Sequence, residues 1–155
     1  MKKQPMEQAR EATRHILGEA GIVLAPAHEI KIMDFGKGDF RNLGLAVIIR
    51  VTEVEYASKW LVLFPGQTCP NHYHEKINET FFIMKGGVTM WANGEQTQMK
   101  AGDQITMKPG TWHKFTSRDG AVIEEVTNRQ YPDDSIFEDR SIERYSIVED
   151  EKPSA

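Results

Sequence analysis

Seven short runs rich in β-branched and aromatic residues, separated by turn residues, constrain the fold of this 155-residue chain more than any other feature. Asn93-Gly94 lies between residues 88–91 and 95–99, and this dipeptide is a strong signal for a tight β-hairpin. Because no helical period separates the runs, a parallel α/β sheet is excluded and we expect an antiparallel sandwich or closed barrel. The predicted strands span residues 45–52, 59–64, 80–84, 88–92, 104–107, 112–116 and 121–127.

One segment ahead of the strands has helical spacing instead. Small and apolar residues recur every three or four positions from Pro5 to Ala20, and Gly21 suits the residue that follows a helix. A single helix cannot form a helix-turn-helix, so we expect it to pack against the barrel or against a partner subunit. The predicted organisation is an N-terminal helix at 1–22, a β-barrel with a C-terminal packing segment at 23–148, and a frayed tail at 149–155.

Charge and cysteine content narrow the class of protein. The net charge is −4 and the charges are interspersed, so the basic stripe that a phosphate backbone needs is missing and nucleic acid is not an expected partner. No apolar stretch approaches the roughly 18 residues that span a bilayer, and the N-terminus lacks the apolar run of a secretory signal. Cys69 is the only cysteine, which fits a reducing compartment. We therefore expect a cytoplasmic protein with no membrane partner.

Three histidines and one glutamate have the spacing of a metal site. His72 and His74 are two residues apart, so on a strand their imidazoles point to the same face; Glu79 follows, and His113 comes after a later Pro-Gly turn. A His-x-His pair alone also arises by chance on a polar strand, but the other two residues make a metal site the favoured interpretation. Imidazoles and a carboxylate suit Mn²⁺, Fe²⁺, Co²⁺, Ni²⁺ or Zn²⁺, and four ligands leave one or two positions for water or substrate.

The glycines around these residues extend the pattern into a family resemblance. The arrangement resembles the two signature motifs of the cupin family, with motif residues Gly66, His72, His74, Glu79 and Gly86, then Gly102, Pro109 and His113. The proline of the second motif lies one residue later than in the family pattern. The resemblance implies an all-β fold, a single cupin double-stranded β-helix barrel with a short N-terminal helix, and the same four metal ligands.

Segments outside the motifs resemble one cupin family, the D-lyxose isomerases. They run in family order to about residue 140: AGIVL at 20–24, MDFG at 33–36, YASKWLVLFPGQTCP at 56–70, GAVIEE at 120–125 and IFEDR at 136–140. This resemblance implies a metal-dependent aldose–ketose isomerase that acts on a small sugar, such as D-lyxose/D-xylulose or D-mannose/D-fructose, through a cis-enediolate. Mn²⁺ is the first expectation for the metal, since sugar oxygens and mixed N/O ligands need room for six-coordination.

Three residues are the candidates for catalysis. Lys59 shares a strand face with Leu61 and Leu63, and a lysine among apolar neighbours must either reach solvent or meet a negative partner. The family places a catalytic lysine at this position, where it would stabilise the enediolate; the alternative is a lysine at the barrel rim. For the base that carries a proton between C1 and C2, Asp139 and Glu125 both match acids of the family, and a solvated tail residue and an outward-facing carboxylate are the respective alternatives.

Two other functions stay open on the sequence alone. A cupin dioxygenase uses the same three-histidine, one-glutamate ligation. A non-catalytic sugar-binding cupin is the other alternative, because the connection at 86–101 is shorter than in the isomerases. Small cupins commonly form dimers, so we expect a homodimer with the N-terminal helix as a candidate contact.

Overall fold

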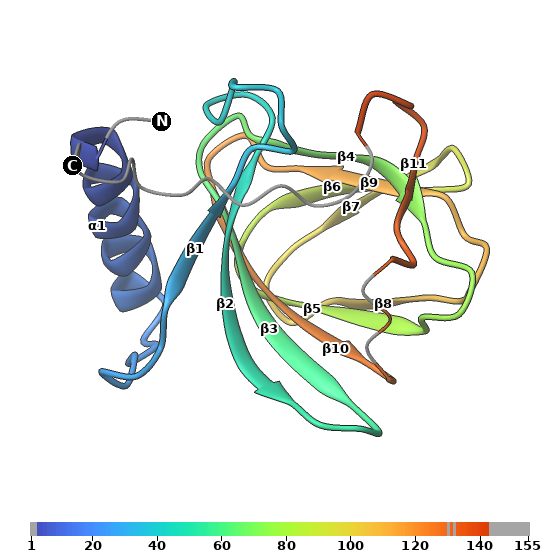
Figure 1. The fold of residues 1–155 in the computed structure, drawn as a ribbon, viewed down its shortest axis with the longest axis horizontal. Coiled ribbons are helices and arrows are strands. Elements are labelled where there is room, and N and C mark those ends of the chain that lie inside the picture. The colour runs from blue at the N-terminus through green and yellow to red at the C-terminus, as the bar shows by residue number, and fades with distance from the viewer. Residues whose placement is uncertain (1–2, 130, 132, 143–155) are drawn as a thin grey trace, which may run out of the picture.

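The computed structural model describes residues 3–129, 131 and 133–142, and within them the chain forms one helix and eleven strands. The strands make two sheets that face each other, and the helix lies against the outside of one of them (Figure 1). In this part of the chain no helix is long and apolar enough to cross a membrane. The tail expected at 149–155, and the end of the barrel segment expected at 23–148, lie outside the described residues.

Every strand pairing within the two sheets is antiparallel, as the sequence predicts. The first sheet has the order β1 (Ile30–Met33), β2 (Leu45–Thr52), β3 (Ala57–Leu63), β10 (Ala121–Thr127), β5 (Glu79–Gly86) and β8 (Gln104–Met107). The second has the order β11 (Ile136–Phe137), β4 (Thr68–Tyr73), β9 (His113–Thr116), β6 (Val88–Ala92) and β7 (Glu95–Met99). The strands predicted at 45–52, 88–92, 104–107 and 121–127 have these bounds in the structure.

One strand that sequence patterning did not delimit carries part of the metal site. β4 contains Pro70, and proline is normally excluded from the interior of a paired strand because it has no N–H to donate. In the structure the register of β4 against β9 shifts between Cys69 and His72, so Pro70 lies at an irregularity where no ladder hydrogen bond is required of it.

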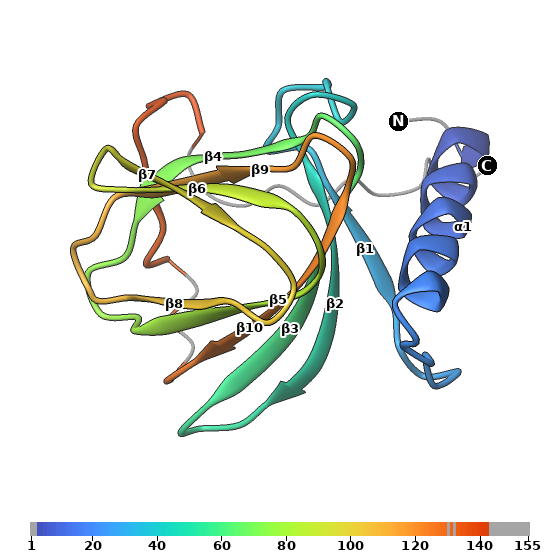
Figure 2. The same ribbon diagram turned by 180° about the vertical axis from the view of Figure 1, so that it is seen from behind.

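The part of the first sheet formed by β1, β2, β3 and β10 buries apolar residues on both faces, because the helix α1 (Lys3–Glu19) packs against its outer side (Figures 1 and 2). Met6 and Leu17 of α1 pack with Ile32, Ile48 and Val62 of the sheet in a cluster separate from the barrel interior. The inward face of the sheet and the second sheet enclose the main core. This explains why strand β2 is a continuous apolar run rather than an alternating one, and it confirms that the helix packs against the barrel.

Gly86 at the end of β5 offers a test of the fold that is independent of the site. Its φ is +83°, and a Cβ there would lie 2.3 Å from the Gly120 carbonyl oxygen, whereas Gly94 has a φ of +80° and no atom within 4 Å. Gly94→Ala should therefore lower the free energy of unfolding by only about 1–2 kcal/mol, the cost of placing an alanine in the left-handed backbone conformation. Gly86→Ala should lose about 1–3 kcal/mol more through overpacking, measured by urea denaturation. Equal losses in the two variants would contradict the close approach.

Candidate metal centre and cavity

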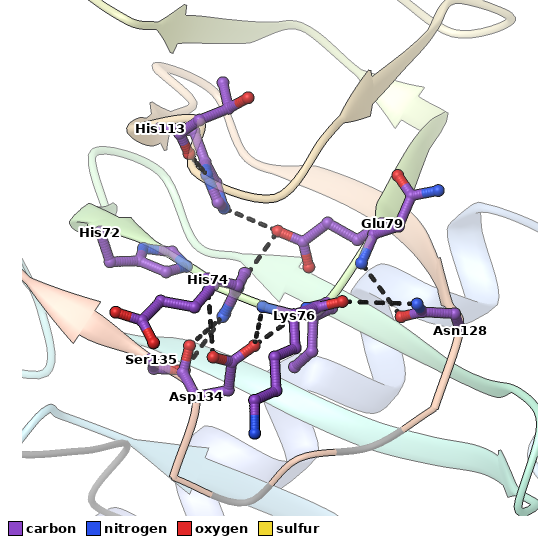
Figure 3. A network of polar contacts seen from close by, with 12 residues as sticks. His72, His74, Lys76, Glu79, His113, Asn128, Asp134 and Ser135 are labelled. Carbon is purple, nitrogen blue, oxygen red and sulfur yellow. Dashed lines mark hydrogen bonds and ion pairs between the residues drawn. The ribbon is translucent and has the colours of Figure 1, made fainter.

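The two sheets bring the four predicted metal ligands together at one point inside the barrel. His72 lies in β4 and His74 just after it, Glu79 begins β5, and His113 begins β9 directly opposite His72. All four side chains are buried, and one ligand atom from each lies within 4.8 Å of the others. Figure 3 shows Glu79 lying between His74 and His113. The structure therefore assembles, from four separate positions, the cluster that spacing alone predicts.

The backbone fixes the orientation of all three imidazoles. The Nδ1 of His72, His74 and His113 lies 2.8, 2.9 and 2.9 Å from the carbonyl oxygens of Pro70, Asp134 and Thr111, respectively. A carbonyl oxygen only accepts hydrogen bonds, so each Nδ1 carries the proton. When the ring is neutral, its lone pair is then on Nε2, the atom available to a metal ion.

The contacts of the glutamate fit a cation at the centre. Glu79 Oε1 lies 2.7 Å from His113 Nε2 and 3.3 Å from His74 Nε2. Within the described residues, Glu79 Oε1 and His113 Nε2 are buried and make no hydrogen bond of acceptable geometry despite this proximity. Buried polar atoms without partners are costly, and a divalent cation would satisfy both. The donor set of three nitrogens and one carboxylate suits a first-row divalent metal.

The protonation of the cluster also suits a metal site. Burial raises the pKa of Glu79, but the imidazoles of His113 and His74 outweigh it and hold that pKa well below its usual range. Burial, followed by the charges of His113 and His74, lowers the pKa of His72. Burial by itself lowers the pKa of His74, but the contact with Glu79 outweighs this effect and leaves the pKa raised. In the metal-free protein Glu79 is therefore ionised and His72 neutral, as ligands must be.

A cavity of about 160 Å³ opens beside the cluster, smaller than the roughly 300–1,000 Å³ of pockets for drug-sized ligands. Its wall is mostly apolar, with Phe81 and Phe115 among its members. The charged members include Lys59 and Glu125, which are direct register partners on β3 and β10. The sequence assigned Lys59 to the same face as Leu61 and Leu63, and the structure has both leucines in the barrel core.

Glu125 is the carboxylate that the cavity perturbs. Burial raises its pKa to about 7, the negative charge of Glu79 adds to the rise, and the Lys59 ammonium opposes it. A carboxylate with a pKa near neutrality can both accept and return a proton, as an acid–base catalyst must. The same surroundings, with burial first, raise the pKa of the Cys69 thiol, so this wall residue is not a thiolate.

The comparisons with known proteins agree with this geometry. The cupin domain family matches residues 59–126. A D-lyxose/D-mannose isomerase from Thermosediminibacter oceani is 32% identical over 180 aligned residues, which cover 97% of this chain and 99% of the relative. The chain belongs to the D-lyxose isomerase family. A D-lyxose ketol-isomerase from Cohnella laeviribosi is 28% identical, with 96% and 98% of the two chains covered.

A solved structure supports the fold of this D-lyxose isomerase family member. The structure of L-ribose isomerase from Cellulomonas parahominis has a TM-score of 0.81, with 97% of this chain and 98% of that chain covered. The sequences are only 11% identical, so the likeness concerns the fold alone. The cupin barrel with one N-terminal helix is thus confirmed.

Asp139, the second candidate base, does not reach the cavity in this family member. Its side chain is 48% exposed and lies 2.8 Å from Lys37 Nζ, and it accepts hydrogen bonds from the backbone N–H and the hydroxyl of Ser141. The contact with Lys37, followed by those with Ser141, lowers its pKa to about 2. A carboxylate with so low a pKa is a poor base. The structure therefore places Asp139 in an exposed turn outside the cavity wall, and its role as the base stays a prediction.

Lys31, Tyr131 and Ser135 line the cavity but were not identified as site residues from the sequence. Lys31 of β1 lines the cavity on the same strand face as Met33, and the alternation that singled out Lys59 would also have identified it. Tyr131 and Ser135 line the cavity from the irregular segment between β10 and β11. No local pattern predicts this, because the segment is placed by contacts distant in sequence.

Proposed function

We propose that this protein is a metal-dependent aldose–ketose isomerase that interconverts D-lyxose and D-xylulose or D-mannose and D-fructose. The observation that carries the proposal is that Lys59 and Glu125, register partners on adjacent strands, both line a small cavity beside a three-histidine, one-glutamate cluster. The D-lyxose isomerases among the relatives support the same substrate class. Cationic and anionic groups facing each other suit a polyol better than the apolar substrate of a dioxygenase.

We propose Mn²⁺ as the metal, with Co²⁺, Fe²⁺, Ni²⁺ and Zn²⁺ as alternatives, held by His72, His74, Glu79 and His113. When bound, the ion would supply Lewis-acid polarisation of the sugar carbonyl. The three backbone carbonyls that fix the imidazoles direct the Nε2 atoms at this position, so the rings would need little reorientation to hold the ion.

The chain's own residues account for the movement of protons. Ionised Glu125 takes the C2 proton of the aldose and returns it to C1, so that one carboxylate serves both half-reactions. Lys59, opposite Glu125, donates a hydrogen bond to the sugar oxygen on which negative charge develops in the cis-enediolate. The hydroxyl proton is also transferred from O2 to O1, which completes the conversion of the aldose to the ketose. The apolar wall around Leu61 and Phe81 limits the access of water to this intermediate.

The reaction itself is tested in D₂O. The metal-loaded protein should form the ketose and introduce deuterium at C2 of D-lyxose or D-mannose, followed by proton NMR. Absence of both exchange and ketose with every pentose and hexose would overturn the proposal. Oxygen consumption by the Fe²⁺-loaded protein would favour a dioxygenase, and sugar binding without turnover would favour a non-catalytic cupin.

We also propose a cytoplasmic homodimer, but not one formed through α1. The outward face of α1 carries the exposed ion pair Arg14–Glu11. Val54 and Tyr56, between β2 and β3, are by contrast exposed apolar side chains and are the better candidates for a contact. Sedimentation of the wild type and of the double variant Val54→Ser/Tyr56→Ser tests this assignment.

Replacing Lys59 with Met should lower kcat about 100- to 1,000-fold, because the variant lacks a donor to the developing oxyanion. The metal affinity should change little, since Lys59 is not a ligand. Lys85→Met is the matched control: Lys85 is 44% exposed, pairs with Glu19, and should tolerate the change with wild-type kcat. Steady-state kinetics of both variants test the role of Lys59. A Lys59→Met enzyme with wild-type kcat would remove Lys59 from the mechanism.

A further inference from the structure

Asp134 joins two distant segments of the chain at the metal centre. It lies between β10 and β11, is 7% exposed, and its carboxylate accepts hydrogen bonds from three consecutive backbone N–H groups. The distances to the nitrogens of Glu75, Lys76 and Ile77 are 3.0, 2.9 and 2.9 Å. Consecutive N–H groups that converge in a turn form a concavity that binds an anion, and here the anion is a side chain of the same protein (Figure 3).

The turn that Asp134 holds is the connection between two metal ligands. It leads from His74 to Glu79, so its conformation sets the separation of the imidazole and the carboxylate. The main chain of Asp134 acts on the same site, because its carbonyl oxygen accepts the hydrogen bond from Nδ1 of His74 at 2.9 Å. One residue therefore fixes the turn through its side chain and the ring orientation of His74 through its backbone.

The same segment also forms part of the cavity wall. Tyr131 and Ser135, on either side of Asp134, line the cavity. Lys76 Nζ, on the anchored turn, lies 5.2 Å from the centre of the Tyr131 ring. A shift of the segment would therefore displace the metal ligand His74 and the wall against which the sugar would bind.

We propose that Asp134 is a positioning residue that sets the geometry of His74 and Glu79 and couples it to the cavity wall. Asp134 belongs neither to the candidate ligand cluster nor to the residues that line the cavity. Its effect on metal binding is independent of the proposed isomerase function, whereas its effect on the KM for sugar rests on that function. The two effects are therefore measured separately.

The experiment compares Asp134→Ala and Asp134→Asn with a matched control. Asp103→Ala removes another aspartate whose carboxylate accepts a backbone N–H, that of Lys100 at 2.9 Å, in the turn between β7 and β8. Dissociation constants for Mn²⁺ and Co²⁺, and the visible spectrum of the Co²⁺ protein, are measured below the unfolding transition of every variant. We expect Asp134→Ala to weaken binding of both metals about 10- to 100-fold and to change the Co²⁺ spectrum. Asp134→Asn, which keeps one acceptor oxygen, should fall between Asp134→Ala and the wild type.

Unchanged metal affinity and an unchanged Co²⁺ spectrum in the Asp134 variants would overturn the proposal, as would an equal loss of affinity in Asp103→Ala. If Asp134→Ala does not fold, Asp134→Asn alone decides between these outcomes. In the isomerase assay, Asp134→Asn saturated with metal should show a KM raised by a larger factor than kcat falls. A wild type that binds metal but does not isomerise any sugar would refute the proposed function and leave the metal-affinity test valid.

Discussion

Glu125→Gln is expected to lower both the rate of exchange at C2 and kcat about 100- to 10,000-fold, the range that general acid–base groups contribute. Gln has the shape of Glu but cannot accept the proton from carbon. Glu125 lines the cavity, and its pKa of about 7 suits a group that must both take up and release a proton. The measurement is the rate of deuterium incorporation at C2, together with kcat, for the metal-saturated variant.

Glu124→Gln is the matched control for this variant. Glu124 is the adjacent residue of β10, but it pairs with Arg50 and does not line the cavity, so its replacement should leave kcat within about twofold of wild type. Asp139→Asn should have an equally small effect, because Asp139 is held by Lys37 at the surface. A larger loss in Asp139→Asn than in Glu125→Gln would reverse the assignment of the base.

The pH profile provides a second check on Glu125. The base works only when ionised, and burial has raised its pKa to about 7, so kcat/KM should rise with pH and level off above neutrality. A bound divalent cation favours the ionised carboxylate, so in the metal-loaded enzyme this rising limb of the kcat/KM profile lies at or below pH 7. The residual activity of Glu125→Gln should lack the limb.

Periodicity predicts which strand residues face the site. A period of two puts Ile123, Glu125 and Thr127 on one face of β10, and Ile123 and Thr127 are buried in the structure. The same rule separates Glu125 from Glu124 and identifies Lys59. The gathering of the four candidate ligands was also predictable, since residues at the starts and ends of paired strands are brought together by the barrel itself.

Irregular segments were not predictable in this way. The orientation of Asp139 depends on a turn in which Ser141 and Lys37, the latter about a hundred residues away in sequence, bind its carboxylate. The role of Asp134 depends on a turn nearly sixty residues away. Such contacts have no period, so a motif match places the residue in the chain but does not place its side chain in the fold.

The largest expected effect on metal binding is that of Glu79→Gln, which removes the only anionic ligand among the four. In the wild type, Mn²⁺ at 100 times its dissociation constant should stabilise the fold by about 2.7 kcal/mol. For a domain of this size that corresponds to a rise in Tm of roughly 5–10 °C. Glu79→Gln should show almost no rise at the same Mn²⁺ concentration and no isomerase activity. Glu75→Gln, an exposed glutamate of the same turn, should keep both.

The pH dependence of metal binding separates the role of Glu79 from that of the histidines. The pKa of Glu79 is already held low by its imidazole neighbours, so it would bind the metal without releasing a proton near neutrality. The pKa of His74 is raised, so the metal must displace a proton from that ring when the pH is low. The affinity of the wild type for Mn²⁺ should therefore increase with pH as His74 deprotonates, and chelators should remove the metal more readily in acid. An affinity independent of pH between 5 and 8 would contradict the ligation of Mn²⁺ by His74.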